Sequence, residues 1–199
     1  MIRSKQDYLN YLKADRIHQV NQKKRSLGTR IIYLFIGRYD VSDFLQLLRK
    51  VEYYQNCKKS QISKGYCRYL RAKLYADGVK LGFYINPNCI GPGLSISHPG
   101  TIIISQIAKV GANCRINPCV VIGQNRGKAP KIGNNVFIGA GAKVIGDITI
   151  ADGIAIGANS VVNKSFLEPN ITIAGIPAKK VSYRGSKGLI IDATGILNT

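Results

Sequence analysis

The sequence contains no tryptophan, only two histidines and only ten acidic residues among 199 positions. With 29 lysines and arginines, its formal net charge is +19. A zinc hydratase site would need about three imidazole ligands, so the scarcity of histidine excludes that class and no metal is expected. His18 lies in a polar stretch and is interpreted as an ordinary surface residue. His98 is therefore the one histidine left for chemistry.

Long apolar runs are also missing. The longest is IIYLFIG at 31–37, far short of the roughly 20 residues that span a bilayer. The first ten residues are polar, unlike a secretory signal. Five cysteines occur without a CxxC pair, which argues against a disulfide framework and favours a reducing compartment. We therefore expect a cytoplasmic protein.

The positive charge is concentrated in the first 80 residues, which hold 18 basic against 6 acidic side chains. A basic surface attracts nucleic acid, an anionic membrane or glycan, or a phosphorylated cofactor. No zinc-finger spacing or aromatic RNA-binding motif accompanies this charge, so nucleic acid is not expected as a partner. Contact of the basic region with an anionic glycan or membrane surface stays open.

Residues 1–80 have the periodicity of helices. Ser4 and Asp7 resemble a capping box in front of a first helical segment. Residues 41–57 place apolar side chains on one broad face, and residues 66–75 form a basic amphipathic segment. A polar connection is expected at 21–28. The sequence predicts an α-helical N-terminal region, 1–80, that covers the end of the next domain or contributes to trimer formation.

From Leu81 onward, branched apolar residues recur at every sixth position. This period matches neither the 3.6 of a helix nor the 2 of a strand, and a short fixed repeat indicates a solenoid. Six residues make one short strand and one turn, and three such units close a triangular coil with the branched residue inside. The longest uninterrupted run is Ile132, Ile138, Val144, Ile150, Ile156 and Val162.

Two departures from this spacing indicate irregular turns. The phase changes between Ile102 and Ile104, which predicts a two-residue adjustment there. The ten-residue step from Ile122 to Ile132 predicts an external loop, GQNRGKAPK at 123–131. Elsewhere Asn and Gly occupy the turns, where a positive φ is least costly for them.

Three segments resemble the hexapeptide-repeat acyltransferases, and within them the serine acetyltransferase-like branch. They are IGPGLSISHPGTIII (90–104), PKIGNNVFIGAGAKVIGDITIADGIAIGANSVV (130–162) and AGIPAKKV (174–181). The resemblance implies a left-handed parallel β-helix over 81–183, followed by a C-terminal tail, 184–199. It also implies a homotrimer with active sites between subunits and acetyl-CoA as the donor. The N-terminal 80 residues are similar, more weakly, to the helical extension of polysaccharide O-acetyltransferases.

The resemblance also assigns roles to residues. His98 is the expected general base, which takes the proton from an acceptor hydroxyl as that hydroxyl attacks acetyl-CoA directly, without an acyl-enzyme. The backbone N–H of Gly123 is the predicted oxyanion donor, although a glycine required only by its turn is an equal alternative. Small residues are expected to contact the pantetheine arm, and two lysines the CoA phosphates. These are Gly139, Ala140, Gly141, Gly157, Ala158, Lys179 and Lys180.

The substrate side departs from the serine-specific relatives. Ser97 stands where an Asp precedes the histidine, Tyr84 lies near the expected partner Asp, and Ala129 replaces a histidine of the loop. Tyr84 or Asn86 is therefore the candidate to orient His98. Four loop residues are the predicted acceptor-binding set: Gln124, Asn125, Arg126 and Lys128.

These departures lead to a prediction of the acceptor. We expect an O-acetyltransferase acting on a hydroxyl of a capsular or lipopolysaccharide sugar, or of its precursor. Three alternatives stay open: a serine O-acetyltransferase of cysteine biosynthesis, N-acetylation of an amino sugar, and a catalytically silent structural trimer.

Overall fold

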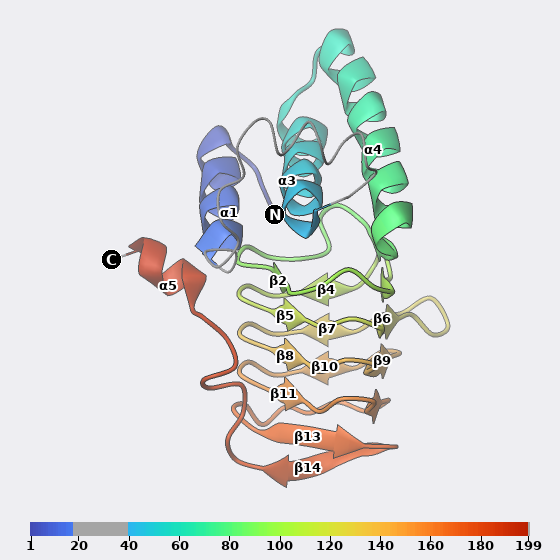
Figure 1. Cartoon of the computed structure of the whole chain (residues 1–199), viewed down its shortest axis with the longest axis vertical. Helices are drawn as coiled ribbons and strands as arrows, with labels where there is room; N and C mark the ends of the chain where they lie inside the picture. The colour runs from blue at the N-terminus through green and yellow to red at the C-terminus, as the bar shows by residue number, and fades with distance from the viewer. Residues whose placement is uncertain (18–39, 199) are drawn as a thin grey trace.

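The structure is a computed structural model that describes residues 1–17 and 40–198. Helices stand at one end of a column of parallel coils, and the C-terminal segment returns along the outside of that column (Figure 1). His18 and the segments 21–28 and 31–37 lie outside the described residues. Among the helices that are described, none has both the length and the apolar character needed to cross a membrane.

The N-terminal helices begin at residues whose side chains cap them. Helix α1 (Lys5–Ile17) follows Ser4, whose Oγ accepts the Asp7 N–H at 3.0 Å. The Asp7 carboxylate in turn accepts the Arg3 N–H at 2.8 Å, which resembles the predicted capping box. Helix α3 (Val41–Cys57) has the predicted bounds and is capped by the side chain of Asp40.

Helix α4 (Gln61–Leu81) is longer than the predicted segment 66–75. Ser60 caps its first turn, and Gly82 ends it with φ +78°. That left-handed conformation suits glycine and closes the last turn. The chain then enters the first strand at Phe83, so the change from helix to strand lies within two residues of the change in sequence periodicity.

In the described part of the chain, fourteen short strands form three sheets, each running along one side of the column. The first sheet consists of β1 (Phe83–Ile85), β3 (Ile102–Ile104), β6 (Val120–Gly123), β9 (Lys143–Ile145) and β12 (Val161–Val162). The second consists of β4 (Lys109–Val110), β7 (Lys131–Ile132) and β10 (Thr149–Ile150). The third consists of β2 (Ser95–Ile96), β5 (Arg115–Ile116), β8 (Phe137–Ile138), β11 (Ala155–Ile156), β13 (Thr172–Gly175) and β14 (Ala178–Ser182).

The described strands of the coils pair in parallel, whereas β13 pairs with β14 in the antiparallel direction. The branched residue of each repeat points inward, so Ile104, Ile122 and Val144 stack on one another and are fully buried. Each such side chain contributes about 1.5–3 kcal/mol when it leaves water. The predicted fold class, a left-handed parallel β-helix preceded by helices, is confirmed.

The two-residue irregularity lies at a different place from the one predicted. Ile102 and Ile104 are both buried within the single strand β3, so no adjustment occurs between them. Instead, five residues (97–101) join β2 to β3, whereas three (117–119) join β5 to β6 directly below. The apolar spacing cannot distinguish these positions, because a strand of three residues buries its first and third side chains alike.

The helices cover the open end of the coil, and one buried arginine ties them to it. Arg49 of α3 is fully buried and pairs with Asp15 of α1 at 2.8 Å and with Glu52 at 3.0 Å. Its guanidinium also donates to the carbonyl oxygens of Ile90 and Gly91 in the first coil. Asp15 accepts the N–H of Leu94 at 2.9 Å. Because these bonds join two helices to the solenoid, we name the Arg49, Asp15 and Glu52 side chains the cap cluster.

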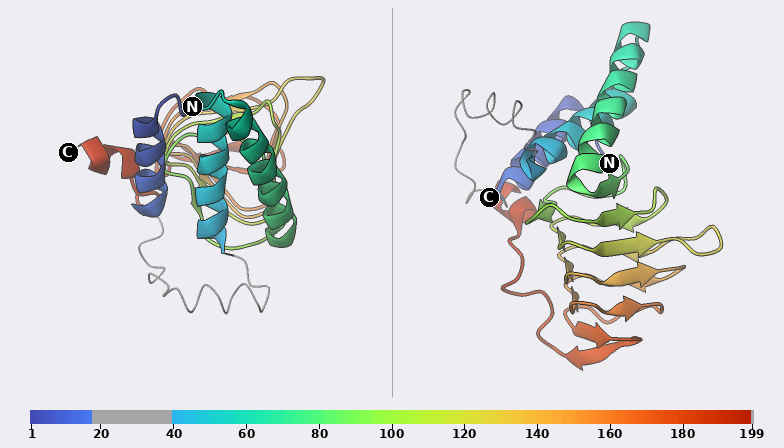
Figure 2. Two further views of the ribbon diagram at one scale, coloured as in Figure 1. Left: turned by 90° about the horizontal axis from the view of Figure 1, so that it is seen from above. Right: turned by 45° about the vertical axis from the view of Figure 1, so that its right-hand side comes forward.

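The C-terminal segment runs along the edge between the second and third sheets, from the last coil back towards the helices. The buried Asn113 side chain donates to Asp192 at 2.7 Å and to Thr194 at 2.8 Å. Helix α5 (Ala193–Asn198) then lies beside α1, as the view from above also shows (Figure 2). The two ends of the chain therefore meet at the same end of the column.

Candidate active site

His98 lies on the five-residue connection between β2 and β3, which we name the His98 corner (97–101). Its side chain is exposed, and the corner is two residues longer than the turn directly below it. Gly100 has φ +145° and stacks over Pro118 of the next coil. The extra length therefore moves His98 outward from the column, where a substrate can reach it.

The turns below the His98 corner form a column of small side chains. Backbone hydrogen bonds join its successive levels, from the Gly141 N–H to the Pro118 carbonyl at 2.9 Å and from the Asn159 N–H to the Ala140 carbonyl at 2.8 Å. Ala140 and Ala158 are exposed on it. The structure thus places His98 and the predicted pantetheine-contacting residues on one edge.

The fold itself requires glycine at several positions of this column. A Cβ atom at Gly139 would lie 2.6 Å from the backbone nitrogen of Ala158, and one at Gly157 would lie 2.9 Å from the Ala174 Cβ. Gly141 has φ +76°. Their presence therefore does not by itself indicate a cofactor, whereas the exposed alanines between them leave a smooth surface.

The two predicted phosphate-binding lysines lie at the far end of the column, on β14. Five strand positions separate β14 from β2 in the third sheet, roughly 24 Å at ~4.8 Å per strand. Lys180 already bonds both carboxylate oxygens of Glu168 at 2.7 Å and lies 3.8 Å from the centre of the Tyr183 ring. Lys179 is exposed. Only a long, extended ligand could span from His98 to these side chains.

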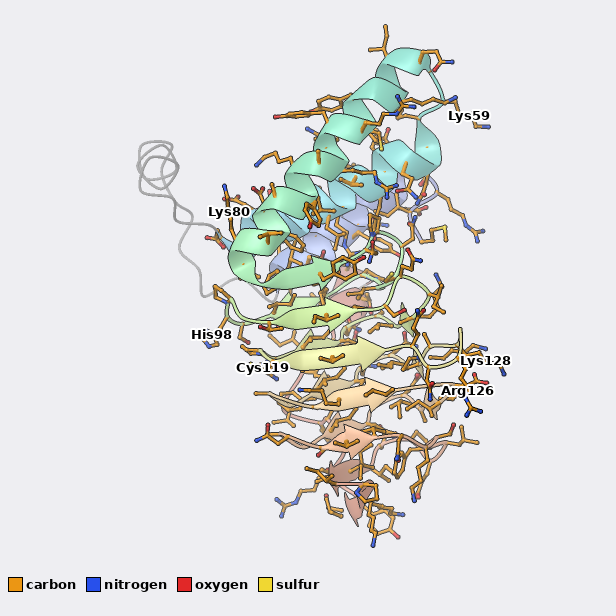
Figure 3. All side chains as sticks on the ribbon, turned by 90° about the vertical axis from the view of Figure 1, so that its right-hand side faces the viewer. Lys59, Lys80, His98, Cys119, Arg126 and Lys128 are labelled. Carbon is orange, nitrogen blue, oxygen red and sulfur yellow. The ribbon has the colours of Figure 1, made fainter. Side chains whose placement is uncertain are left out.

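The insertion loop lies on the opposite edge of the first sheet from His98. Figure 3 shows Arg126 and Lys128 on one side of the column and His98 with Cys119 on the other. The Asn125 and Lys128 backbones bond each other in both directions, so the loop is a tight hairpin. Lys128 pairs with Asp147 at 2.6 Å, and Gln124 accepts from Ser105 at 3.3 Å. Within one subunit, this predicted acceptor-binding set is separated from His98 by the width of the sheet.

The remaining predicted site residues do not contact His98 either. Tyr84 is exposed on the outward face of β1, and Asn86 lies past the end of that strand, on the loop side. No hydrogen bond joins either residue to His98 within the described part of the chain. Gly123 ends β6, and its carbonyl accepts the Gly146 N–H at 3.1 Å. Within one subunit, none of these residues is therefore placed to act on His98 through a hydrogen bond.

Gly123 can be separated from the structural glycines by substitution. A Cβ atom there would lie 3.6 Å from Ile145, an ordinary contact, and its φ is not positive. We therefore expect Gly123→Ala to keep the melting temperature within about 2 °C, whereas Gly139→Ala clashes with backbone and lowers it by roughly 4 °C or more. Thermal denaturation of both variants checks this. Equal destabilisation would show that Gly123 is required by the fold.

Sequence reasoning missed two residues near His98. Cys119 is exposed in the turn directly below the His98 corner and has φ +64°. Arg115 reaches Ser97 from the strand below. Both could have been found by counting residues from one coil to the next, because Arg115 is the register partner of Ser95 in the coil above. Among the residues that are described, no group of three His, Cys, Asp or Glu side chains could hold a metal ion.

Comparison with known proteins agrees with this architecture. Residues 129–164 match the bacterial transferase hexapeptide family (six repeats). The coils of this chain thus carry the hexapeptide repeats of that family. The serine acetyltransferase of Staphylococcus xylosus is 39% identical over 127 residues, which are 60% of this chain and 58% of the relative. This hexapeptide-repeat chain thus spans less than two thirds of the length of that curated relative.

Solved structures of serine acetyltransferases have the same fold as this hexapeptide-repeat chain. The Neisseria gonorrhoeae enzyme superposes with a TM-score of 0.67 at 25% identity, covering 91% of this chain and 68% of that one. The same enzyme in complex with serine gives a TM-score of 0.66 at 26% identity, covering 90% and 71%. The likeness therefore extends beyond the coils into the helical region.

These findings correct the prediction of a cell-surface sugar as acceptor. The similar proteins and structures are serine acetyltransferases, so the prediction of a capsular or lipopolysaccharide acceptor, and of a saccharide partner, is wrong. It gave too much weight to three side chains, Ser97, Tyr84 and Ala129. Differences at single positions change contacts within a site, whereas the likeness extends over most of the chain.

Proposed function

We propose that this chain is an acetyl-CoA-dependent O-acetyltransferase whose acceptor is the hydroxyl of serine. The observation that carries the proposal is the position of His98, exposed on a lengthened corner above a column of small side chains. Serine as acceptor is supported by the names of the relatives and by the serine complex of the Neisseria gonorrhoeae enzyme.

His98 would act as the general base. It would take the hydroxyl proton of serine while the hydroxyl oxygen attacks the thioester carbonyl. The carbon–sulfur bond would then break, and the imidazolium would give the proton to the sulfur, so that CoA leaves as the thiol. Such a base contributes about 10²–10⁴-fold to a rate. No acyl-enzyme is needed, because both substrates can meet at the His98 corner. Gly123 would supply a backbone N–H to the oxyanion from a neighbouring subunit.

The donor would lie along the small-residue column. Its thioester would be near His98, its pantetheine arm would pass Ala140 and Ala158, and its phosphates would approach Lys179. The length of that path suits an extended ligand such as acetyl-CoA. Lys180 would have to exchange Glu168 for a phosphate, so Lys179 is the stronger of the two candidates.

The rate of CoA release from acetyl-CoA tests the proposed function. We expect purified protein to release CoA with L-serine present at least about tenfold faster than without an acceptor. Amino sugars and neutral sugars serve as comparison acceptors. Release that no acceptor stimulates would contradict the proposal and favour the alternative of a catalytically silent trimer.

We also propose that the site forms between subunits of a homotrimer. The support is that His98 and the insertion loop lie on opposite edges of the first sheet, so two copies side by side bring one edge of each together (Figure 3). The outward face of that sheet, with Tyr84 52% and Ile103 41% exposed, would lie towards the neighbour. The loop residues Gln124, Asn125, Arg126 and Lys128 would then contact serine bound at the neighbour's His98.

Mixed trimers test this arrangement. One variant is His98→Asn, and the other replaces the four loop residues with alanine. At low serine concentration each alone is expected to be nearly inactive. In any closed ring containing both, one junction combines an intact His98 with an intact loop, so co-expressed mixtures should regain about one third of the wild-type rate per mixed trimer. If the site lies within one subunit, mixing restores nothing.

The division into an N-terminal region (1–80), a β-helix domain (81–183) and a tail (184–199) belongs to the same proposal. The helices would cap the coil, the coil would hold the site, and the tail would fasten the column to α1. Contact of the basic N-terminal region with an anionic glycan or membrane surface, and a cytoplasmic location, stay predictions.

A further inference from the structure

A guanidinium group lies beside the residue that precedes His98. Arg115 is on β5, directly below β2 in the third sheet, and its side chain runs up the outward face of that sheet. Its Nη2 donates to the Ser97 Oγ at 3.1 Å. Its Cζ also lies 5.9 Å from the centre of the Phe137 ring, one coil further down. The ring and the hydroxyl together fix where the charge is placed.

The hydrogen bonds of this guanidinium are incomplete. Its Nε is buried and has no hydrogen-bond partner. None of the ion pairs between described residues involves Arg115. A buried donor without an acceptor is unfavourable, and an arginine prefers a planar, two-oxygen acceptor that meets Nε and Nη2 together. Among the described residues, Arg115 therefore has one donor without an acceptor and a charge without an anionic partner.

Ser97 adds a second donor to the same place. Its Oγ accepts from Arg115, so its own hydroxyl hydrogen stays available for an oxygen of a ligand. An acidic residue at this position would neutralise Arg115, as Asp15 does for Arg49. With serine instead, the positive charge beside His98 is left for the substrate.

We propose that Arg115 and Ser97 bind the carboxylate of the acceptor and so select a hydroxy amino acid over a neutral hydroxyl compound. The inference rests on the proposed function and deepens it by naming the specificity-determining residue. Ser97 and His98 are consecutive, and consecutive Cα atoms are ~3.8 Å apart. That distance is comparable to the span of serine from carboxylate to hydroxyl, so a carboxylate held at Arg115 would direct the hydroxyl towards His98.

The test compares two acceptors, L-serine and ethanolamine, which is serine without its carboxylate. In the wild-type chain, kcat/KM should be higher for L-serine. Arg115→Met keeps an unbranched stem against Phe137 but removes the charge. We expect it to reduce the ratio of kcat/KM for L-serine to that for ethanolamine by about 10- to 100-fold, the value of a hydrogen-bonded charge. The KM for acetyl-CoA should stay unchanged.

The matched control is Arg71→Met, an exposed arginine of α4, which should leave the ratio as in the wild type. A variant that merely disturbs the corner would slow both acceptors equally and leave the ratio intact, which would overturn the inference while the proposed function stands. Release of CoA that neither acceptor stimulates in the wild-type chain would overturn the proposed function and this inference with it.

Discussion

Replacing Arg49 with methionine is expected to lower the free energy of unfolding by about 3–5 kcal/mol. The substitution leaves the carboxylates of Asp15 and Glu52 buried without their cation. Burial alone would lower the pKa of the arginine, but the two carboxylates outweigh it, so the pKa is raised above its usual value and the guanidinium stays charged. The substitution also removes the donors that the Ile90 and Gly91 carbonyl oxygens bond in the wild-type protein.

Chemical denaturation measures this loss. The matched control is Lys73→Met, which removes an exposed ion pair with Asp77 on α4 and should cost no more than about 0.5 kcal/mol. If Arg49→Met costs less than about 1 kcal/mol, the cap cluster does not fasten the helices to the coil. In that case the N-terminal region would be expected to unfold separately from the β-helix.

Replacing His98 with asparagine is expected to reduce kcat for acetyl transfer to serine by about 10²–10⁴-fold. Asparagine keeps a polar side chain on the corner but cannot take up the hydroxyl proton. Because His98 is exposed, the fold should not change. The KM for acetyl-CoA should therefore stay within about threefold of the wild-type value, since the column of small residues is intact.

Two measurements distinguish loss of the base from other causes. Thermal denaturation should give the same melting temperature for His98→Asn and the wild type. The KM for acetyl-CoA should also match in the two proteins, because the loss of a base changes proton transfer and not donor binding. A variant that retained more than a tenth of the wild-type kcat would show that another group accepts the proton.

The fold could be predicted from the sequence because the repeat has one physical cause. Each six-residue unit turns a branched residue into the coil, so Ile132, Ile138 and Val144 had to face the same interior. The position of the extra two residues could not be predicted, because Ile102 and Ile104 fit the interior equally well. The loop at 123–131 was predictable, since nothing else accounts for a ten-residue step from Ile122 to Ile132.

The candidate site was predictable only in part. His98 stood out because its motif is specific and histidine is scarce. Arg115 did not, because its contact with Ser97 depends on how many residues separate the paired strands β2 and β5, and the turn lengths determine that number. The cap cluster was likewise hidden, since Asp15 and Arg49 are 34 residues apart and meet only when α1 and α3 pack on the coil. Single departures from a family pattern proved a poor guide to the acceptor.

The central claim is that acetyl-CoA and serine react at the His98 corner, and identification of the product tests it most directly. The protein would be incubated with acetyl-CoA labelled with carbon-13 in the acetyl group and with L-serine, and the product followed by NMR. The account predicts a labelled O-acetyl ester of serine that forms in step with CoA and is absent with His98→Asn. Labelled acetate alone, or an ester that forms equally well in the variant, would contradict it.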